Sequence, residues 1–420
     1  MSAVNAWLTA IGDLDETDIA SADTSAKLKE YFSIDVNNPL VSTLQNELWD
    51  AQVNINEAVK SANLLDSAWP GYTELTKSYL FFCYSVDPND PVGTFDAYGR
   101  FYSALQSAYG NARGCALNDV VIQSTKRMLF LFSRAAEELK WVSGVLQRIF
   151  NSIRSEKPAE GANSKRPVLL FIAGALCRVY FWTDQYSSCS TVFNNIHTAS
   201  LVMSEHPIAQ QIEFRFWLGR YNLNRNNLVL AFKHLHWCYT RCPRQFPNHR
   251  VIFKYLLLPS ILLGRMPSPA LLQAHDLIDP FMPLIYSLKS GSFSGYYQVR
   301  NHPWFHKHRL DHLLLRNVPT AIWRQALARA YKWLSNPKQL DFELMAVVMS
   351  YSKGLNTEPV SVLEAESFGI ACINAGLLKG IDLPATGAFL LRTQDTWPSP
   401  KAVFKIMDPN LGEKNEWMNT

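Results

Sequence analysis

The sequence predicts an all-α fold: an α-solenoid of helical hairpins, capped by a C-terminal winged helix with a small β wing. Three observations favour this fold. Apolar residues recur at spacings of three and four from about residue 41 onward, as in amphipathic helices. No alternating run indicates a strand in the first 330 residues. After residue 317, three helical segments precede a short, glycine-broken segment that is typical of a two-stranded hairpin.

Length and composition limit the class of protein. The chain has 420 residues, enough for two or three domains, and 48% of them are hydrophobic, which excludes disorder for the bulk of the chain. No run of about 18 uncharged apolar residues occurs, and the first residues do not resemble a signal peptide. Seven scattered cysteines are typical of reduced, buried thiols. We expect a soluble protein that is not secreted and has no disulfide framework.

The order of segments predicts five parts. Residues 1–40 are acidic and form either a weakly packed N-terminal arm or a short helical start. Helical repeats follow over residues 41–205, with a loop at 154–167 that is rich in Pro, Gly and charged residues. A second set of helical repeats covers 206–316, the winged helix 317–395 and a C-terminal tail 396–420.

One hairpin in the second set of repeats has a close helix crossing. In the stretch "AQQIEFRFWLGRYNLNRNNLVLAFKHLHWCYTRCP", Gly219 is expected to let two helices approach and Ala231 to fill the crossing. The next helix, Asn248 to Ser268, places Pro259 in its middle and carries basic residues opposite its apolar face. Such a hairpin cannot bury its own apolar face, so we expect it to stack on its neighbours.

Charge is distributed unevenly along the chain. Residues 1–100 hold 15 Asp and Glu against five Lys and Arg, whereas residues 213–332 hold 17 Lys and Arg against four acids. Such a division creates a field that attracts polyanions or acidic partner segments to the basic part.

Motifs for catalysis and metal binding are weak. No phosphate-binding glycine loop, dinucleotide fingerprint, His-Glu-x-x-His or Gly-x-Ser-x-Gly motif occurs, so we expect no enzyme and no cofactor. His234, Cys238, Cys242 and His249 have the ligand types of a zinc site, but three of them on one helix drift apart, and a packed helix is favoured over a metal site. The histidines of "HPWFHKHRLDH" are expected on a solvated basic face.

The basic residues give the strongest functional signal. On "VPTAIWRQALARAYKWL", Arg324, Arg329 and Lys332 fall outside the apolar side and lack acidic residues three or four positions away. Unpaired cations are available to phosphate, although a solvated face is the plain alternative. Together with Lys307, Arg309 and Arg316 they are the predicted nucleic-acid contacts. Trp304, Trp323 and Trp333 are expected in the core.

Five stretches in order resemble one known family, the PCI-domain proteins, and within it the PCI subunit of the TREX-2 messenger-RNA export complex. They are "QQIEFRFWLGRYNL", "LAFKHLHWC", "NHRVIFKYLLLPSILLGRMPS", "TAIWRQALARAYKWL" and "VLEAESFGIACINAGLLKG". The likeness extends from about residue 140 to 392.

The resemblance implies a nuclear, non-enzymatic scaffold subunit, found near the nuclear envelope or pore. It implies a second PCI subunit as partner, a small acidic disordered protein shared with the proteasome lid, and RNA or DNA on the paired winged helices. Basic positions of the family match Arg324 and Lys332. We assign the acidic partner to the basic middle of the chain, namely Arg220, Arg225, Lys233, Arg250 and Lys254. The wing "IDLPATGAFLLR" has almost no cations, which disfavours direct wing contact with nucleic acid.

Two alternatives stay open. The same fold could serve as a protein-only scaffold in a signalosome-, proteasome-lid- or splicing-related complex, or as an initiation-factor subunit. An enzyme would need a bound metal or cofactor.

Overall fold

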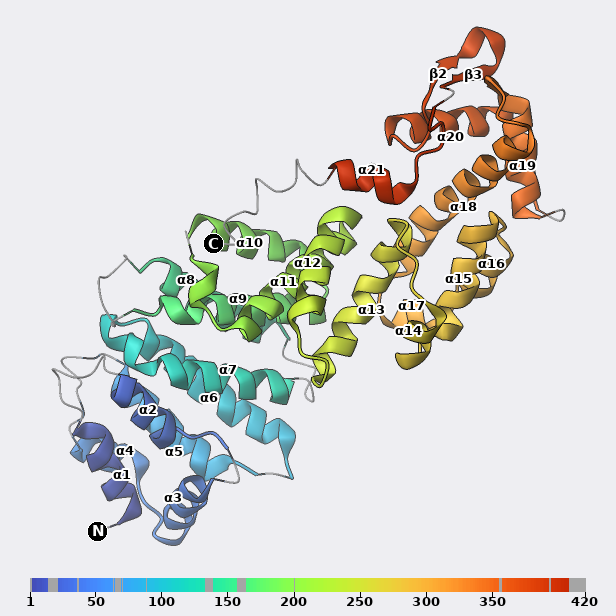
Figure 1. Cartoon of the computed structure of the whole chain (residues 1–420). Coiled ribbons are helices and arrows are strands. Elements are labelled where there is room, and N and C mark those ends of the chain that lie inside the picture. The colour runs from blue at the N-terminus through green and yellow to red at the C-terminus, as the bar shows by residue number, and fades with distance from the viewer. Residues whose placement is uncertain are drawn as a thin grey trace. The chain divides into compact units, whose positions relative to one another are not determined.

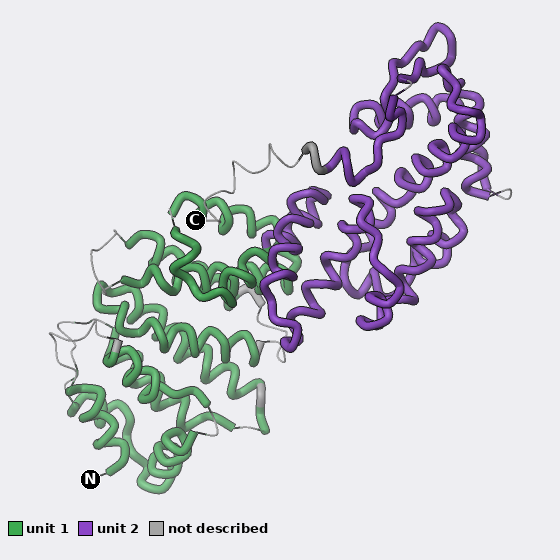
Figure 2. Tube along the Cα trace, in the orientation of Figure 1, with its two compact units in different colours: residues 1–217, 420 green, residues 218–419 purple. Residues whose placement is uncertain are grey.

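The computed structural model describes residues 2–13, 22–35, 38–62, 64, 69, 71–87, 89–132, 139–156, 164–199, 201–354, 357–392 and 394–407. These residues divide into two compact units, 1–217 and 218–419 (Figure 2). The division lies inside helix α11, Ile208–Asn224, shortly after the predicted boundary at residue 206. The predicted boundaries all stay predictions. Among the described residues, no helix is long and apolar enough to cross a bilayer.

Unit 1 is a series of helices that pack on helices near them in the chain (Figure 1). Its α-helices are α1 Ala3–Gly12, α2 Ala22–Tyr31, α3 Pro39–Asp50, α4 Ile55–Ser61, α5 Tyr72–Ser85, α6 Pro91–Tyr109, α7 Asn118–Phe132, α8 Leu139–Arg154, α9 Arg166–Trp182 and α10 Cys189–Thr198. Short 3₁₀ helices cover Ala112–Leu117, Tyr186–Ser188 and Met203–Glu205. For example, α6 packs on α5 and α7, and α9 packs on α8 and α10. The main pairs are α5 with α6 and α8 with α9, as expected for helical hairpins.

The first helix contributes to the core of unit 1. Trp7 stacks on Tyr79 with ring centroids 5.3 Å apart, and Phe32 meets both rings edge-on. The indole nitrogen of Trp7 donates a hydrogen bond of 3.0 Å to the carbonyl oxygen of Tyr31. Of the two alternatives for residues 1–40, the described residues therefore show a packed helical start.

Polar caps fix where several helices begin. Asn38 and Asp90 each accept backbone N–H bonds at the start of a helix whose first residue is proline, Pro39 and Pro91. This combination satisfies the unpaired donors of the first turn and needs no hydrogen at the proline nitrogen. The helix boundaries are thus set by local side chains.

Unit 2 continues with helices α12 Leu228–Arg241, α13 Pro247–Leu262, α14 Pro269–Ala274, α15 Ile278–Ser290, α16 Ser294–Val299, α17 Pro303–Lys307 and α18 Asp311–Trp333. The close crossing expected at Gly219 is confirmed, because a Cβ atom there would lie 2.7 Å from Cγ of Leu235 on α12. Ala231 is fully buried beside this contact. The α12–α13 and α15–α16 pairs repeat the hairpin pattern.

The cap at the end of unit 2 combines the C-terminal half of α18 with α19 Phe342–Lys353, α20 Val362–Asn374 and a small sheet. The strands are β1 Gln339–Asp341, β2 Gly380–Leu383 and β3 Ala388–Leu391, antiparallel in the order β1-β3-β2. Helix α21 Pro400–Met407 follows. The predicted fold class is confirmed: helical hairpins of the α-solenoid type with a small β wing. Strand β1, which precedes α19, was not predicted.

Candidate partner and nucleic-acid interface

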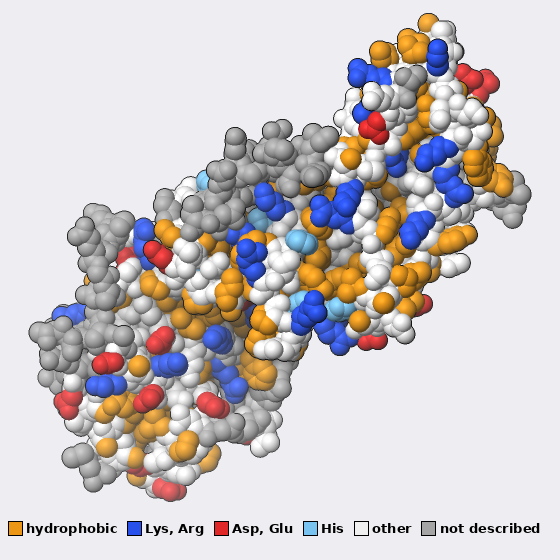
Figure 3. All heavy atoms as spheres, viewed as in Figure 1, with side chains coloured by type: hydrophobic (Ala, Val, Ile, Leu, Met, Phe, Trp, Pro, Cys, Tyr) orange, Lys and Arg blue, Asp and Glu red, His pale blue; other side chains and the backbone are white. Residues whose placement is uncertain are grey.

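The most basic part of the chain contains no acid. Between Glu213 and Asp276 there are nine Lys and Arg residues and no Asp or Glu. In unit 2 this stretch forms α12, α13 and α14, and Figure 3 shows Lys, Arg and His side chains over α12 and α13. These cations cannot be neutralised by carboxylates of their own helices. They are therefore available to acids elsewhere or to ligands.

Three cations from three helices converge on His308. Burial, followed by the charges of Lys254, Lys307 and Arg220, lowers the pKa of His308 to about 4. Among the described residues, the charges that contribute to this shift are all positive. Burial and the surrounding positive charge together keep this histidine neutral. We call Arg220, Lys254, Lys307 and His308 the His308 cluster.

Aromatic rings hold the His308 cluster in place. The Arg220 guanidinium lies over the ring of Tyr255 at 4.1 Å, and Tyr255 meets His308 edge-on at 5.8 Å. The ring of Trp304 lies 4.4 Å from that of His308. Among the described residues, the ammonium groups of Lys254 and Lys307 form no ion pair. A flat guanidinium held on an aromatic ring, with two ammonium groups acting on the same imidazole, suits an anionic ligand.

The other predicted partner residues lie in different surroundings. Arg250 forms an ion pair of 2.9 Å with Asp276, and Arg225 donates to the hydroxyl of Tyr221 at 2.9 Å. Lys233 lines a separate pocket beside α21. The structure thus brings together only Arg220 and Lys254 of the five, and adds Lys307 from the predicted nucleic-acid set.

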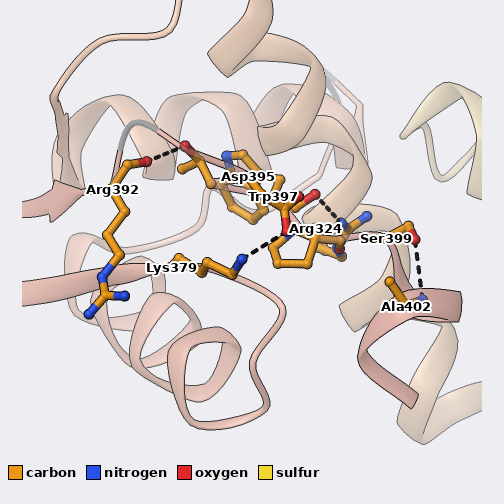
Figure 4. Close-up of polar contacts among 9 residues, drawn as sticks. Arg324, Lys379, Arg392, Asp395, Trp397, Ser399 and Ala402 are labelled. Atoms are coloured by element: carbon orange, nitrogen blue, oxygen red, sulfur yellow. Dashed lines mark hydrogen bonds and ion pairs between the residues drawn. The ribbon is translucent and has the colours of Figure 1, made fainter. Parts of the chain in front are cut away.

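Arg324 differs from the prediction. It was expected outside the apolar side of its helix, but it is only 7% exposed, and its guanidinium donates to the carbonyl oxygens of Trp397 and Pro398 (Figure 4). The prediction of an open position was wrong, because the segment after β3 folds back over this part of α18. Periodicity within one helix does not show what covers it.

The remaining predicted nucleic-acid contacts are exposed: Lys307, Arg309, Arg316, Arg329 and Lys332. Arg329 donates to the carbonyl oxygen of Ser290 at 2.7 Å and lies 5.6 Å from the ring of Trp333. Arg309 has a left-handed backbone with φ of 57°. Their charges can reach phosphate, whereas that of Arg324 cannot.

The third helix of the cap lacks cations. Helix α20 reads "VLEAESFGIACIN", with two Glu and no Lys or Arg. Near the wing, Lys379 is paired with Asp395 at 2.8 Å. Because phosphate contact requires cations or donors, α20 offers little for a nucleic-acid backbone.

Exposed apolar side chains on the cap were missed by the sequence argument. Trp333 is 79% exposed, so its expected place in the core was wrong, while Trp304 and Trp323 are partly buried. The exposed apolar residues of the cap are Trp333, Leu334, Val347, Tyr351, Val362, Leu363, Ile370, Ile381 and Leu390. We call them the cap face set. A signal was present, since α19 is apolar on more than one side and one helix cannot bury all sides at the edge of a domain.

Two geometric relationships indicate that members of this set share surfaces. Val347 and Tyr351 lie one turn apart on α19, and Ile381 pairs directly with Leu390 across β2 and β3. Figure 3 shows hydrophobic side chains along the edge of the cap where α19 lies. Exposed apolar groups that gather in this way are typical of protein interaction sites.

The histidines and cysteines considered for zinc lie mostly in the interior. His234 and Cys238 are buried on α12, and His249 packs on the ring of Tyr239 at 4.3 Å. Within the described ranges, no group of three or more His, Cys, Asp or Glu side chains converges in a way that could hold a metal ion.

Comparison with known proteins identifies several distant relatives. No family model matches the chain. It is 24% identical over 351 residues to a PCI domain-containing protein of Schizosaccharomyces pombe, covering 77% of this chain and 78% of that protein. It is 24% identical over 356 residues to nuclear mRNA export protein THP1 of Saccharomyces cerevisiae, covering 73% and 78%. Enhanced ethylene response protein 5 of Arabidopsis thaliana is 21% identical over 402 residues, covering 91% and 93%.

The fold is a series of helical hairpins with a small β wing, and its described surfaces include a basic cluster and an apolar cap. The resemblance to PCI-domain proteins is confirmed, and these relatives include a protein named for nuclear mRNA export.

Proposed function

We propose that the chain is a non-enzymatic scaffold subunit of a TREX-2-like complex, which couples transcription to nuclear export of messenger RNA. The observation that carries this proposal is the His308 cluster, in which the charges of Lys254, Lys307 and Arg220 all act on one imidazole. A surface of this kind concentrates polyanions and speeds their encounter. The relative named as a nuclear mRNA export protein supports the assignment to export and to the nucleus. A place near the nuclear envelope or pore is part of the same proposal.

A second PCI subunit docks, in this proposal, on the cap. The cap face set supplies large aromatic and aliphatic side chains, such as Trp333 and Tyr351, and aromatic residues of this type commonly anchor protein interfaces. The α20 helix has no cations that would be buried without partners on binding. Its composition therefore favours a protein partner over a nucleic-acid groove.

The basic helices take the acidic partners. Arg220 and Lys254 are the proposed contacts of a small acidic disordered protein, because they lie in the His308 cluster and Lys254 has no ion pair among the described residues. Lys307, Arg309, Arg316, Arg329 and Lys332 are the proposed contacts of RNA or DNA. Lys307 belongs to the His308 cluster as well as to the nucleic-acid contacts, so the two ligands are expected to compete there.

Nucleic-acid binding is tested by its dependence on salt. The purified complex with its partner should bind single-stranded or duplex nucleic acid with an affinity that falls steeply as salt rises, because bound phosphates release counterions. The variant Lys307→Glu/Arg316→Glu should weaken binding by roughly tenfold or more and make the salt slope shallower. Lys289→Glu, an exposed cation on α15 outside these sets, is the matched control. Arg324 is unsuitable for charge reversal, because its guanidinium is buried.

A protein-only scaffold is the second candidate. It is favoured by α20 and the wing, which present apolar side chains and few cations where a winged helix would read nucleic acid. This candidate would be selected if nucleic-acid binding were the same in the wild type, the double variant and the control, and did not depend on salt. The acidic protein would then be the sole ligand of the His308 cluster.

A further inference from the structure

A second basic site lies beside α21 in unit 2. It is a pocket of about 410 Å³ between the outer side of α12, the end of α13 and helix α21. Lys233, Arg241, Arg265 and Lys401 supply four cations to its walls, His236 adds an imidazole, and no acid lines it. We call it the α12–α21 pocket. Its volume falls in the range of pockets that hold small ligands or single side chains.

The backbone around this pocket is closely fitted. Gly264 has a φ of 81°, a conformation that favours glycine, and a Cβ atom there would lie 3.1 Å from the backbone nitrogen of Lys401. The start of α21 is thus seated directly on the end of α13. The N–H of Arg265 donates to the carbonyl oxygen of Ser260 at 2.8 Å, which fixes the residue that carries the guanidinium.

Two guanidinium groups of the pocket lie flat on aromatic rings. Arg265 lies over Phe232 at 4.2 Å, and Arg241 lies over Trp237 at 4.3 Å. His236 also stacks on Phe232, with centroids 5.2 Å apart. Stacking holds each guanidinium in one plane, so its paired N–H groups are arranged in advance for the oxygens of a phosphoryl group.

The same stacking indicates whether the pocket suits a phosphoryl group with or without an attached nucleobase. Phe232 already has a guanidinium and an imidazole against it, and Trp237 has a guanidinium, so these rings offer little free face for a nucleobase. Burial and the charge of Arg265 lower the pKa of His236, which leaves its ring neutral and able to donate or accept at neutral pH. A compact dianion without a base suits these walls.

We propose that the α12–α21 pocket binds the phosphoryl group of a phosphorylated serine or threonine in a partner polypeptide. Phosphorylation adds nearly two negative charges and three acceptor oxygens, which match the guanidinium and ammonium groups of the pocket. Binding of a partner here depends on a kinase. This site requires neither nucleic acid nor a second PCI subunit, so it goes beyond the proposed function.

The test uses the full chain and three fluorescein-labelled peptides. The peptides consist of Gly and Ala except at one position, which is phosphoserine, serine or glutamate. Fluorescence anisotropy at physiological salt should show the phosphoserine peptide binding at least about tenfold more tightly than the other two. Arg241→Gln/Arg265→Gln should abolish this preference. Arg300→Gln is the control, since Arg300 is an exposed arginine lying 5.3 Å from the ring of Tyr297, outside the pocket. Lys401→Gln is an independent variant on α21. It should weaken binding of the phosphoserine peptide and leave binding of the other two peptides unchanged.

Equal affinity for the three peptides would overturn the proposal, as would a preference that survives the double variant while its thermal unfolding matches wild type. Competition separates the sources of phosphate. Displacement of the phosphopeptide by millimolar inorganic phosphate supports phosphoryl recognition. Displacement by a single-stranded oligonucleotide at lower concentration than unlabelled phosphopeptide would assign the pocket to nucleic acid instead. The nucleic-acid contact variant Lys307→Glu/Arg316→Glu should keep the phosphopeptide affinity, so failure of this proposal is distinguishable from failure of the proposed function.

Discussion

The guanidinium of Arg324 donates a hydrogen bond of 3.2 Å to the backbone carbonyl oxygen of Trp397. The same group donates to the carbonyl oxygen of Pro398 (Figure 4). This contact ties the long helix α18 to the segment between β3 and α21, more than 70 residues later. It makes Arg324 a structural residue of the cap.

Replacing Arg324 should destabilise the protein. In Arg324→Gln, two carbonyl oxygens lose a charged donor in a buried site, so we expect a loss of roughly 2–4 kcal/mol in the free energy of unfolding. Arg329→Gln on the same helix is the control, since Arg329 is exposed, and it should change stability by less than about 0.5 kcal/mol. Urea unfolding followed by circular dichroism measures both. Equal stability of the two variants would contradict the role of Arg324.

His308 should make stability depend on pH. Its pKa is about 4 in the folded chain and near 6.5 when unfolded, so the unfolded state binds the extra proton between these values. Stability therefore rises with pH through this window and is lost as pH falls from about 6.5 towards 4. His308→Gln should reduce the change in unfolding free energy across this window by roughly 1–2 kcal/mol, with allowance for solvent screening of a partly exposed group.

The charges behind the His308 shift can be tested directly. Lys254→Gln removes one of the cations that lower the pKa of His308, so the pKa should move upward. Nuclear magnetic resonance titration of the His308 ring reports this movement. Lys289→Gln, whose charge does not act on His308, is the control. An unchanged titration in Lys254→Gln would mean that the charge of Lys254 does not contribute to the shift.

Two glycines should respond to alanine in opposite directions. At Gly369 on α20, a Cβ atom would lie 2.2 Å from the buried ring of Phe389, so Gly369→Ala should cost about 1–3 kcal/mol through displacement of that ring. At Gly144 on α8, nothing lies within 4 Å of the added atom. Gly144→Ala should stabilise its helix by about 0.5–1 kcal/mol. Thermal unfolding compares the variants, and destabilisation by both would contradict the packing described for Gly144.

The role of the cap face set in assembly can be tested separately from any role in folding. Trp333→Ser and Tyr351→Ser remove aromatic side chains that are 79% and 77% exposed. Such changes should shift stability by less than about 1 kcal/mol, while weakening assembly with a partner PCI subunit by roughly tenfold or more. Lys338→Ser, an exposed position between α18 and β1, is the control. Co-purification and analytical ultracentrifugation measure assembly, and full assembly by both cap variants would exclude this surface.

The local sequence pattern predicts most of the fold, because buried apolar residues recur every three or four positions in a helix. The hairpin at Gly219 and the strands around Gly387 follow from such patterns and from glycine at a close approach or turn. Strand β1 is different. It has three residues, Gln339–Asp341, of which only Leu340 is buried, and its pairing with β3 joins residues about 50 positions apart. No local pattern contains that pairing.

The candidate site was predicted less completely than the fold, for the same reason. Basic residues could be counted, but their partners come from distant elements. Arg324 is covered by the Trp397 segment, and Arg250 is paired with Asp276. Lys254 and Lys307 act on His308 from separate helices. The order of residues shows an excess of cations, while only the tertiary fold shows which of them remain at the surface.

The cap face set also bears on how the protein is made. In an unassembled chain, Trp333 and Tyr351 leave an apolar surface exposed to water. Such a surface promotes binding by chaperones, proteolysis and self-association. Its abundance should then follow the supply of its partner, and loss of one subunit should deplete the other through degradation of orphan copies.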